Sequence, residues 1–144
     1  MVDLDAILAA WHETFNRGDL DGVMTYFAPD AVYCPGDGKE HRGVTAIRAA
    51  FAPQFAGRFG HMRFDLEDQL IDRQARKATT RWICRHDLRD ARNMPAWLRL
   101  PILARFGARV AWRGVDVFHF DAAGKLTGKF TYANYGRPRL YRDR

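Results

Sequence analysis

Hydrophobic and polar positions alternate at helical spacing in the first part of the chain and at strand spacing in the second. Apolar residues recur every three or four positions from Leu4 to Phe15, and Gly18 permits the left-handed backbone that ends a helix. Asp19 has a side chain suited to cap the helix that follows. The pattern therefore predicts three helices, over residues 4–17, 19–29 and 44–55, and a short strand over residues 31–34.

Alternation with a period of two takes over after residue 60, where apolar and charged residues alternate in four runs. Each run has one apolar side, which is typical of strands that cover a core on one face. The last two runs are joined by a short connection, Asp121–Gly124, which predicts an antiparallel hairpin. The four predicted strands cover residues 62–70, 81–88, 110–121 and 126–135. Helices first and strands later predict an α+β domain.

Asp116 is an acid on the otherwise apolar side of the third predicted strand. It shares that side with Val110, Trp112, Phe118 and Phe120, because successive strand side chains point to opposite faces. An unpaired carboxylate is costly in such surroundings, so the group must find a partner or become neutral. Buried acids of this kind are candidates for function, which makes Asp116 the first candidate catalytic residue.

The length of 144 residues suits one domain with a substantial core, and the formal net charge of +6 comes mostly from scattered arginines. Outward positions of the predicted strands hold Arg81, Arg85, Arg109 and Arg113. A solvated or subunit-facing sheet surface explains this pattern better than a nucleic-acid interface does. The basic cluster over residues 137–144 is expected to be a frayed, solvated end.

Membrane and export signals are not evident in the sequence. No apolar run approaches the roughly 20 residues of a membrane-spanning helix, and the first residues are acidic where a secretory leader is basic. We therefore expect a cytoplasmic protein with no membrane or nucleic-acid partner, in which Cys34 and Cys84 are buried free thiols. No set of His, Asp or Glu has the spacing of a metal site, and no cofactor is expected.

Three motifs follow one another in an order that resembles a known superfamily. They are the run from Phe15 to Val32, His41-Arg-Gly43 before a helix, and the run from Gly114 to Leu126. The chain resembles the nuclear transport factor 2-like superfamily, in its SnoaL-like and ketosteroid isomerase-like branch. The resemblance makes residues 1–144 a single domain with an insertion at about 89–107. It implies a cone-shaped α+β barrel, in which a curved, mostly antiparallel sheet wraps around three N-terminal helices and a ligand pocket. It also implies a homodimer through the outer sheet face.

The resemblance assigns roles to some residues and leaves one role empty. Asp116 matches the protonated aspartic acid that donates a hydrogen bond to the substrate oxyanion in ketosteroid isomerase, and Trp11 falls at the position of the oxyanion tyrosine. The general base should fall at Cys34 or Pro35, and neither is a carboxylate. Ketosteroid isomerase activity is therefore not expected.

His86 is the alternative base. It lies on the apolar side of a predicted strand that we expect to pair with the strand of Asp116, one or two residue pairs away. A histidine and an aspartic acid that line one pocket could perform acid–base chemistry near neutral pH. The alternative for His86 is a histidine that is merely hydrogen-bonded at the end of the sheet.

Large aromatic side chains are expected to line the same pocket. The candidates for ligand binding are Trp11, Tyr33, Trp82, Trp112, Phe118 and Tyr132. Rings fill cores as readily as they line pockets. In the alternative interpretation, Asp116 accepts hydrogen bonds from Trp11, Trp82 or Tyr132 and only stabilises the core. If the cone is open, the rings imply a small, flat, apolar ligand.

Residues 89–107 combine apolar and basic side chains. The apolar ones are too many to leave singly in water: Trp97, Leu98, Leu100, Ile102, Leu103 and Phe106. They should cover the mouth of the pocket, meet a second subunit or touch a membrane surface. Pro95 and Pro101 break any long helix and so disfavour the membrane.

Two functions remain after these steps. The first is a cofactor-independent isomerase, cyclase or dehydratase that acts on a small hydrophobic carbonyl compound by acid–base chemistry, with Asp116 and His86 as the catalytic residues. The second is a non-catalytic member of the superfamily that binds a small apolar molecule or has a structural role. A cavity that reaches both residues would favour the enzyme, and a filled cone would count against it.

Overall fold

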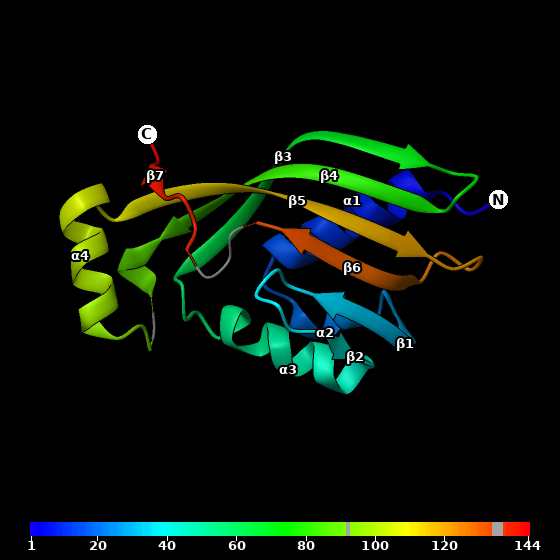
Figure 1. Cartoon of the computed structure of the whole chain (residues 1–144), viewed down its shortest axis with the longest axis horizontal. Coiled ribbons are helices and arrows are strands. Elements are labelled where there is room, and N and C mark those ends of the chain that lie inside the picture. The colour runs from blue at the N-terminus through cyan, green and yellow to red at the C-terminus, as the bar shows by residue number, and fades with distance from the viewer. Residues whose placement is uncertain (92, 134–136) are drawn as a thin grey trace.

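The computed structural model describes residues 1–91, 93–133 and 137–144. Its elements, in chain order, are α1 (Leu4–Asn16), α2 (Leu20–Met24), β1 (Phe27–Cys34), β2 (His41–Arg42), α3 (Val44–Phe55), β3 (His61–Asp72), β4 (Lys77–Asp87), a 3₁₀ turn (Leu88–Asp90), α4 (Ala96–Phe106), β5 (Arg109–Phe120), β6 (Leu126–Tyr132) and β7 (Tyr141–Arg142) (Figure 1).

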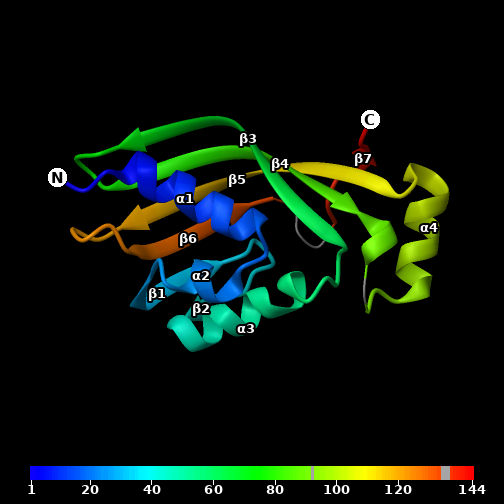
Figure 2. The same cartoon turned by 180° about the vertical axis from the view of Figure 1, so that it is seen from behind.

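A curved, unclosed sheet with the strand order β2-β1-β6-β5-β4-β3 forms one layer, and β7 adds to β5. The three N-terminal helices lie against one side of this sheet, and α4 lies at its far end (Figures 1 and 2). Among the described strand pairs, β1 and β6 run parallel and the others antiparallel. The predicted α+β architecture, with a mostly antiparallel sheet around three helices, is confirmed.

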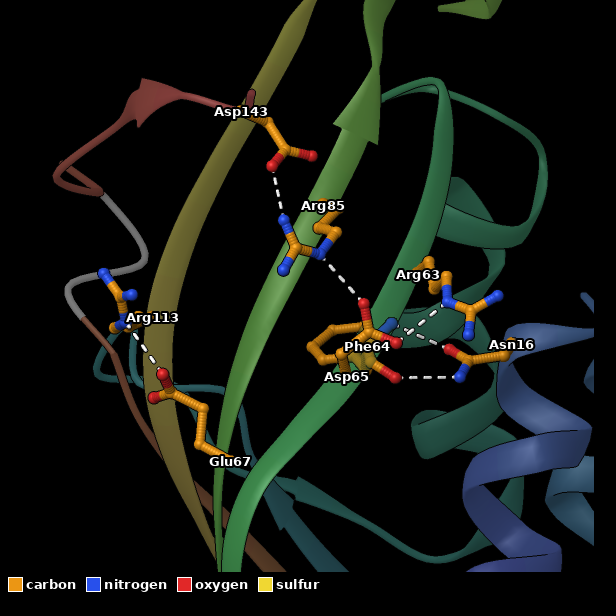
Figure 3. Close-up of polar contacts among 8 residues, drawn as sticks. All are labelled: Asn16, Arg63, Phe64, Asp65, Glu67, Arg85, Arg113 and Asp143. Carbon is orange, nitrogen blue, oxygen red and sulfur yellow. Dashed lines mark hydrogen bonds and ion pairs between the residues drawn. The ribbon is translucent and has the colours of Figure 1, made fainter.

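The end of α1 is fixed to the sheet by one asparagine. Asp3 caps the start of α1, and apolar residues from Leu4 to Phe15 face the core. At the other end, the side chain of Asn16 both donates to the carbonyl oxygen of Phe64 and accepts from its N–H, each at 2.8 Å (Figure 3). Because β3 is an edge strand, these two bonds pair backbone groups that no neighbouring strand reaches.

The second predicted helix is shorter than expected. It ends at Met24, and Phe27 already belongs to β1, where it pairs with Leu126 of β6. The prediction of a helix up to Pro29 is therefore wrong. Leu20, Val23 and Met24 reach the core from α2, whereas Phe27 reaches the same core from β1.

A bulge in β6 reverses which of its side chains face inward. The antiparallel hairpin of β5 and β6 is confirmed, but Phe120 pairs with Leu126 while His119 pairs with Gly128, so Thr127 is an extra residue. One extra residue moves every later side chain to the opposite face. The inward position predicted for Tyr132 is therefore wrong, since this side chain is 68% exposed. The inward position predicted for Asn134 and the end of the strand at Tyr135 lie outside the described residues.

Ion pairs cover the outer face of the sheet. Arg85 bonds both to Asp65, at 2.9 Å, and to Asp143, while Arg113 lies 3.3 Å from Glu67 (Figure 3). The outward positions predicted for the arginines are confirmed. The prediction of a frayed C-terminal end is wrong, because β7 pairs with β5 and Asp143 holds the last turn of chain against β4. A homodimer through this face stays a prediction.

α4 forms in spite of its two prolines. Pro95 precedes its first turn, where a missing N–H costs nothing, and Pro101 lies inside the helix. The helix is 11 residues long and continues through Pro101, so this proline does not break it. Trp97 and Leu100 are exposed, whereas Ile102 and Leu103 pack against a small apolar cluster around Leu88. None of the described helices is long and apolar enough to cross a bilayer.

Candidate functional site

Asp116 has a buried cation as its partner. Its side chain on β5 is 3% exposed, and the facing strand β6 brings Lys129, 5% exposed, and Thr131 to the same side of the sheet. The ammonium nitrogen of Lys129 lies 3.0 Å from Oδ1 of Asp116, and the hydroxyl of Thr131 donates to the same oxygen at 2.6 Å. Lys129 also donates to Oγ1 of Thr131 at 3.0 Å. The carboxylate thus finds a partner, as its burial requires.

Aromatic rings surround the ammonium group of Lys129. Its nitrogen lies 5.1 Å from the ring centroid of Tyr33, 5.7 Å from that of Trp11 and 5.8 Å from that of Phe118. Such contacts favour a cation, and more so where water is excluded. Three of the aromatic residues expected at the site therefore lie around the lysine, which strand parity alone predicts as outward-facing.

The cone around Asp116 is almost filled. A chamber of about 30 Å³ borders Asp116, Lys129 and Thr131, with Tyr33, Trp82 and Trp112 among its other lining residues. This space suits a single water molecule. A smaller void of about 10 Å³ lies beside Trp11. The indole N–H groups of Trp11 and Trp82 are buried and have no hydrogen-bond partner among the described residues, so the chamber region has spare donors.

His86 lies far from Asp116 along the sheet. It pairs with Val110, six residues before Asp116 on β5, which corresponds to about 20 Å along a strand. The prediction that both residues line one pocket is wrong, because the register between β4 and β5 separates them. A catalytic role for His86 stays a prediction, with surroundings that differ from those expected.

Both ring nitrogens of His86 are hydrogen-bonded. Nδ1 donates to the carbonyl oxygen of Phe59 at 3.0 Å, and Nε2 accepts from the indole N–H of Trp112 at 2.7 Å. This arrangement requires the neutral ring, and burial lowers the pKa of His86 from its ordinary value, with the Phe59 bond opposing the shift. His86 therefore holds Trp112 in place as a neutral acceptor.

A larger apolar cavity lies beneath α4. Its volume is about 280 Å³, and we call it the α4 cavity. It is lined by Phe59, Met62, His86, Leu88, Met94, Leu98, Ile102, Val110, Trp112, Pro138 and Leu140. The 89–107 segment contributes Met94, Leu98 and Ile102, so part of it does cover a cavity. The apolar excess of that segment is the signal that pointed here, and the opposite wall includes His86 and Trp112, two of the residues that were predicted to line a pocket.

Metal ligands do not gather in the part of the chain that is described. No group of three His, Cys, Asp or Glu side chains there could hold a metal ion. Both cysteines are free, as predicted, although Cys34 is only half-buried. Burial raises the pKa of the Cys84 thiol well above its ordinary value, which makes it a poor nucleophile.

Comparison with known families agrees with this arrangement. The family described as "SnoaL-like domain" matches residues 8–128, which is most of the chain. The chain belongs to the SnoaL-like family. No curated protein is similar enough to this SnoaL-like protein to count as a match.

Solved structures share the fold of this SnoaL-like protein at low identity. The epoxide hydrolase/cyclase-like enzyme SalBIII, with a role in pyran ring formation in the polyether salinomycin, is 18% identical, with a TM-score of 0.68 over 90% of this chain and 88% of that one. A Mycobacterium tuberculosis protein in complex with estradiol-17beta-hemisuccinate is 17% identical, with a TM-score of 0.66 over 89% and 91%. A Xanthomonas campestris protein provisionally assigned as a polyketide cyclase is 22% identical, with a TM-score of 0.62 over 92% and 91%.

Proposed function

We propose that this SnoaL-like protein binds a small hydrophobic molecule in the α4 cavity. The observation that carries the proposal is the cavity itself, which at about 280 Å³ is close to the lower end of the range for small-molecule pockets, roughly 300–1,000 Å³. Its walls are apolar except for His86, whose ring nitrogens are both engaged. Affinity for a ligand would therefore come mainly from burial of apolar surface.

The relative from Mycobacterium tuberculosis supports this proposal at the level of the fold. That protein was solved with estradiol-17beta-hemisuccinate, a molecule with a large apolar body. The proposal for the present chain differs in its location, because the cavity lies under α4 and the cone around Asp116 has room for only a water molecule.

A pair of matched variants tests the proposal. Leu98 lines the cavity, whereas Leu100 lies on the same helix and is 61% exposed. We expect Leu98→Trp to fill the cavity and to abolish the fluorescence enhancement of 8-anilinonaphthalene-1-sulfonate, while Leu100→Trp binds the dye like the unaltered protein. Circular dichroism checks that both variants fold. Equal dye binding by the two variants would show that the dye sits elsewhere and would contradict the proposal.

Acid–base chemistry at Asp116 is the second candidate function. It is favoured by one observation, namely that a carboxylate and an ammonium group, both buried, meet at the wall of a chamber inside the cone. An ammonium group can polarise a carbonyl oxygen, and a carboxylate can remove the neighbouring α-proton, which is the first step shared by many isomerases, cyclases and dehydratases. A substrate would have to enlarge the chamber in order to reach them.

Proton exchange provides a test that needs no knowledge of the natural substrate. If the candidate is correct, the protein should accelerate exchange of the α-protons of 2-decanone in D₂O, followed by mass spectrometry, and Asp116→Asn should remove the acceleration. His119→Asn, on a half-buried histidine of the same strand that faces away from the chamber, is the control. Exchange no faster than in buffer would remove this function.

A further inference from the structure

Met62 is a shared wall of three cavities. It lines the α4 cavity, the chamber beside Asp116 and an open groove of about 460 Å³ between the ends of α1 and α3 and the start of β3. Trp112 also lines the first two of these cavities. These two side chains therefore stand between the α4 cavity and the buried ion pair.

Of the two, Met62 is the side chain that can move. Trp112 is held by its hydrogen bond to His86 and by edge-to-face packing on Trp82, with the ring centroids 5.2 Å apart. Met62 is half-buried and packs against the cluster of Trp82, Cys84 and Trp112 from its edge. A methionine side chain is unbranched and adopts many rotamers, and the groove gives this one space on its other side.

The chamber behind Met62 favours a hydrogen-bond acceptor. The indole N–H of Trp82 is buried without a partner among the described residues. The ammonium group of Lys129 has three donors, of which two are used by Asp116 and Thr131. Asp116 already accepts two hydrogen bonds on one oxygen. An uncharged oxygen of a ketone, ether or alcohol suits these donors, whereas an apolar chain end would leave the indole unpaired.

We propose that Met62 is a gate between the α4 cavity and the chamber, and that it sets how long a ligand the protein accepts. The ligand is an apolar molecule with an oxygen acceptor at one end. Its body fills the α4 cavity, and when Met62 turns toward the groove its oxygen reaches Trp82 and Lys129. This inference rests on the proposed function, because it needs a ligand in the α4 cavity.

Chain length is the experimental variable that tests the gate. Displacement of 8-anilinonaphthalene-1-sulfonate gives the dissociation constants of 2-octanone and 2-dodecanone. Each further CH₂ that becomes buried raises the affinity by roughly a factor of four. Met62→Ala should therefore raise the affinity for 2-dodecanone, relative to the affinity for 2-octanone, by about tenfold or more. Met94→Ala is the matched control, because Met94 lines the α4 cavity but not the chamber. It should leave the ratio unchanged.

Two further variants test the mechanism of the gate. Met62→Ile introduces a side chain of similar volume that is stiff at χ1. It should weaken the binding of 2-dodecanone and leave the binding of 2-octanone unchanged. In the Met62→Ala background, Trp82→Phe removes the spare donor and should weaken 2-dodecanone by about threefold or more, the effect of one lost hydrogen bond. Met62→Ile also keeps the gate testable if Met62→Ala fails to fold.

The possible failures point to different errors. If Leu98→Trp does not reduce dye or ketone binding, the ligand does not sit in the α4 cavity and the proposed function fails. If Leu98→Trp abolishes binding but Met62→Ala and Met94→Ala give the same chain-length ratio, the α4 site stands and the gate is overturned. The gate proposal would also be overturned if Trp82→Phe, in the Met62→Ala background, left the affinity for 2-dodecanone unchanged.

Discussion

Removal of one member of the buried ion pair should destabilise the protein far more than removal of both. Lys129→Met leaves the Asp116 carboxylate buried with only the Thr131 hydroxyl as a described partner. Asp116→Asn leaves the ammonium group in its cage of rings without a counter-charge. The double variant buries neither charge, and its asparagine can still accept from Thr131.

The magnitude follows from the bonds that are lost. Lys129→Met removes two hydrogen bonds of a charged donor, at 3.0 Å each, and such bonds contribute about 1.5–3 kcal/mol apiece. Each single variant should therefore lower the free energy of unfolding by about 3–5 kcal/mol, which is also typical for a buried charge left alone. The double variant should lose only about 1–3 kcal/mol, because two uncharged side chains need no counter-charge. The coupling energy would then be about 3 kcal/mol or more.

Urea unfolding followed by tryptophan fluorescence at pH 7 measures all four proteins of this cycle. Lys125→Met is the control, since Lys125 is exposed and the described contacts of its side chain include only one hydrogen bond, to the backbone carbonyl of Thr25. It should change the free energy of unfolding by less than about 1 kcal/mol. A coupling energy below about 0.5 kcal/mol would refute the reasoning, because it would mean that the two charges do not depend on each other in the folded protein.

Three further predictions concern the frame around the site. Asn16→Ala should cost about 1–3 kcal/mol in urea unfolding, since it leaves both backbone groups of one edge-strand residue unpaired; a loss below about 0.5 kcal/mol would contradict the role given to Asn16. Burial lowers the pKa of His12 and His86, so as the pH falls the unfolded chain binds protons before the folded protein does. The melting temperature should therefore be highest above about pH 6.5 and should fall as the pH drops below that value. A melting temperature that stays constant down to about pH 5.5 would show that neither ring is buried and neutral. Gly60→Ala should lower the melting temperature much more than Gly18→Ala. Both glycines have φ of +75°, but only at Gly60 would the new Cβ lie 2.0 Å from a backbone oxygen, that of Asp87 in β4. Equal changes in melting temperature would contradict this close approach.

The fold could be predicted from the sequence because its signals are local. Helical spacing, the cap at Asp19, the glycine after α1 and the alternation in the strands each need only a few neighbouring residues. The burial of Asp116 follows from parity within one strand, and the structure confirms it. The contribution of residues 89–107 to a cavity follows from an excess of apolar side chains that water would not tolerate singly.

The partners of Asp116 could not be predicted, because they depend on a single extra residue. Parity counted from Leu126 places Lys129 and Thr131 outward and Tyr132 inward, and the bulge at Thr127 exchanges the two sets. Gly128 lies beside the bulge, and an isolated glycine in a strand can mark one, but it does not say whether a residue is extra or which one. The distance between His86 and Asp116 could not be predicted for a similar reason, because the register of β4 against β5 depends on how the chain returns after α4.

The bulge also explains why the chamber is lined by both an acid and a cation. Without it, the carboxylate would face apolar rings and would be stable only in its neutral form. With it, the charge of Lys129 is brought opposite the acid, and both donors and acceptors are retained inside the cone. Replacing a buried ion pair with apolar groups is often neutral or stabilising, so stability alone does not account for this pair. If the double variant unfolds nearly as the unaltered protein does but no longer favours ligands that end in an oxygen atom, the pair acts in recognition at the chamber.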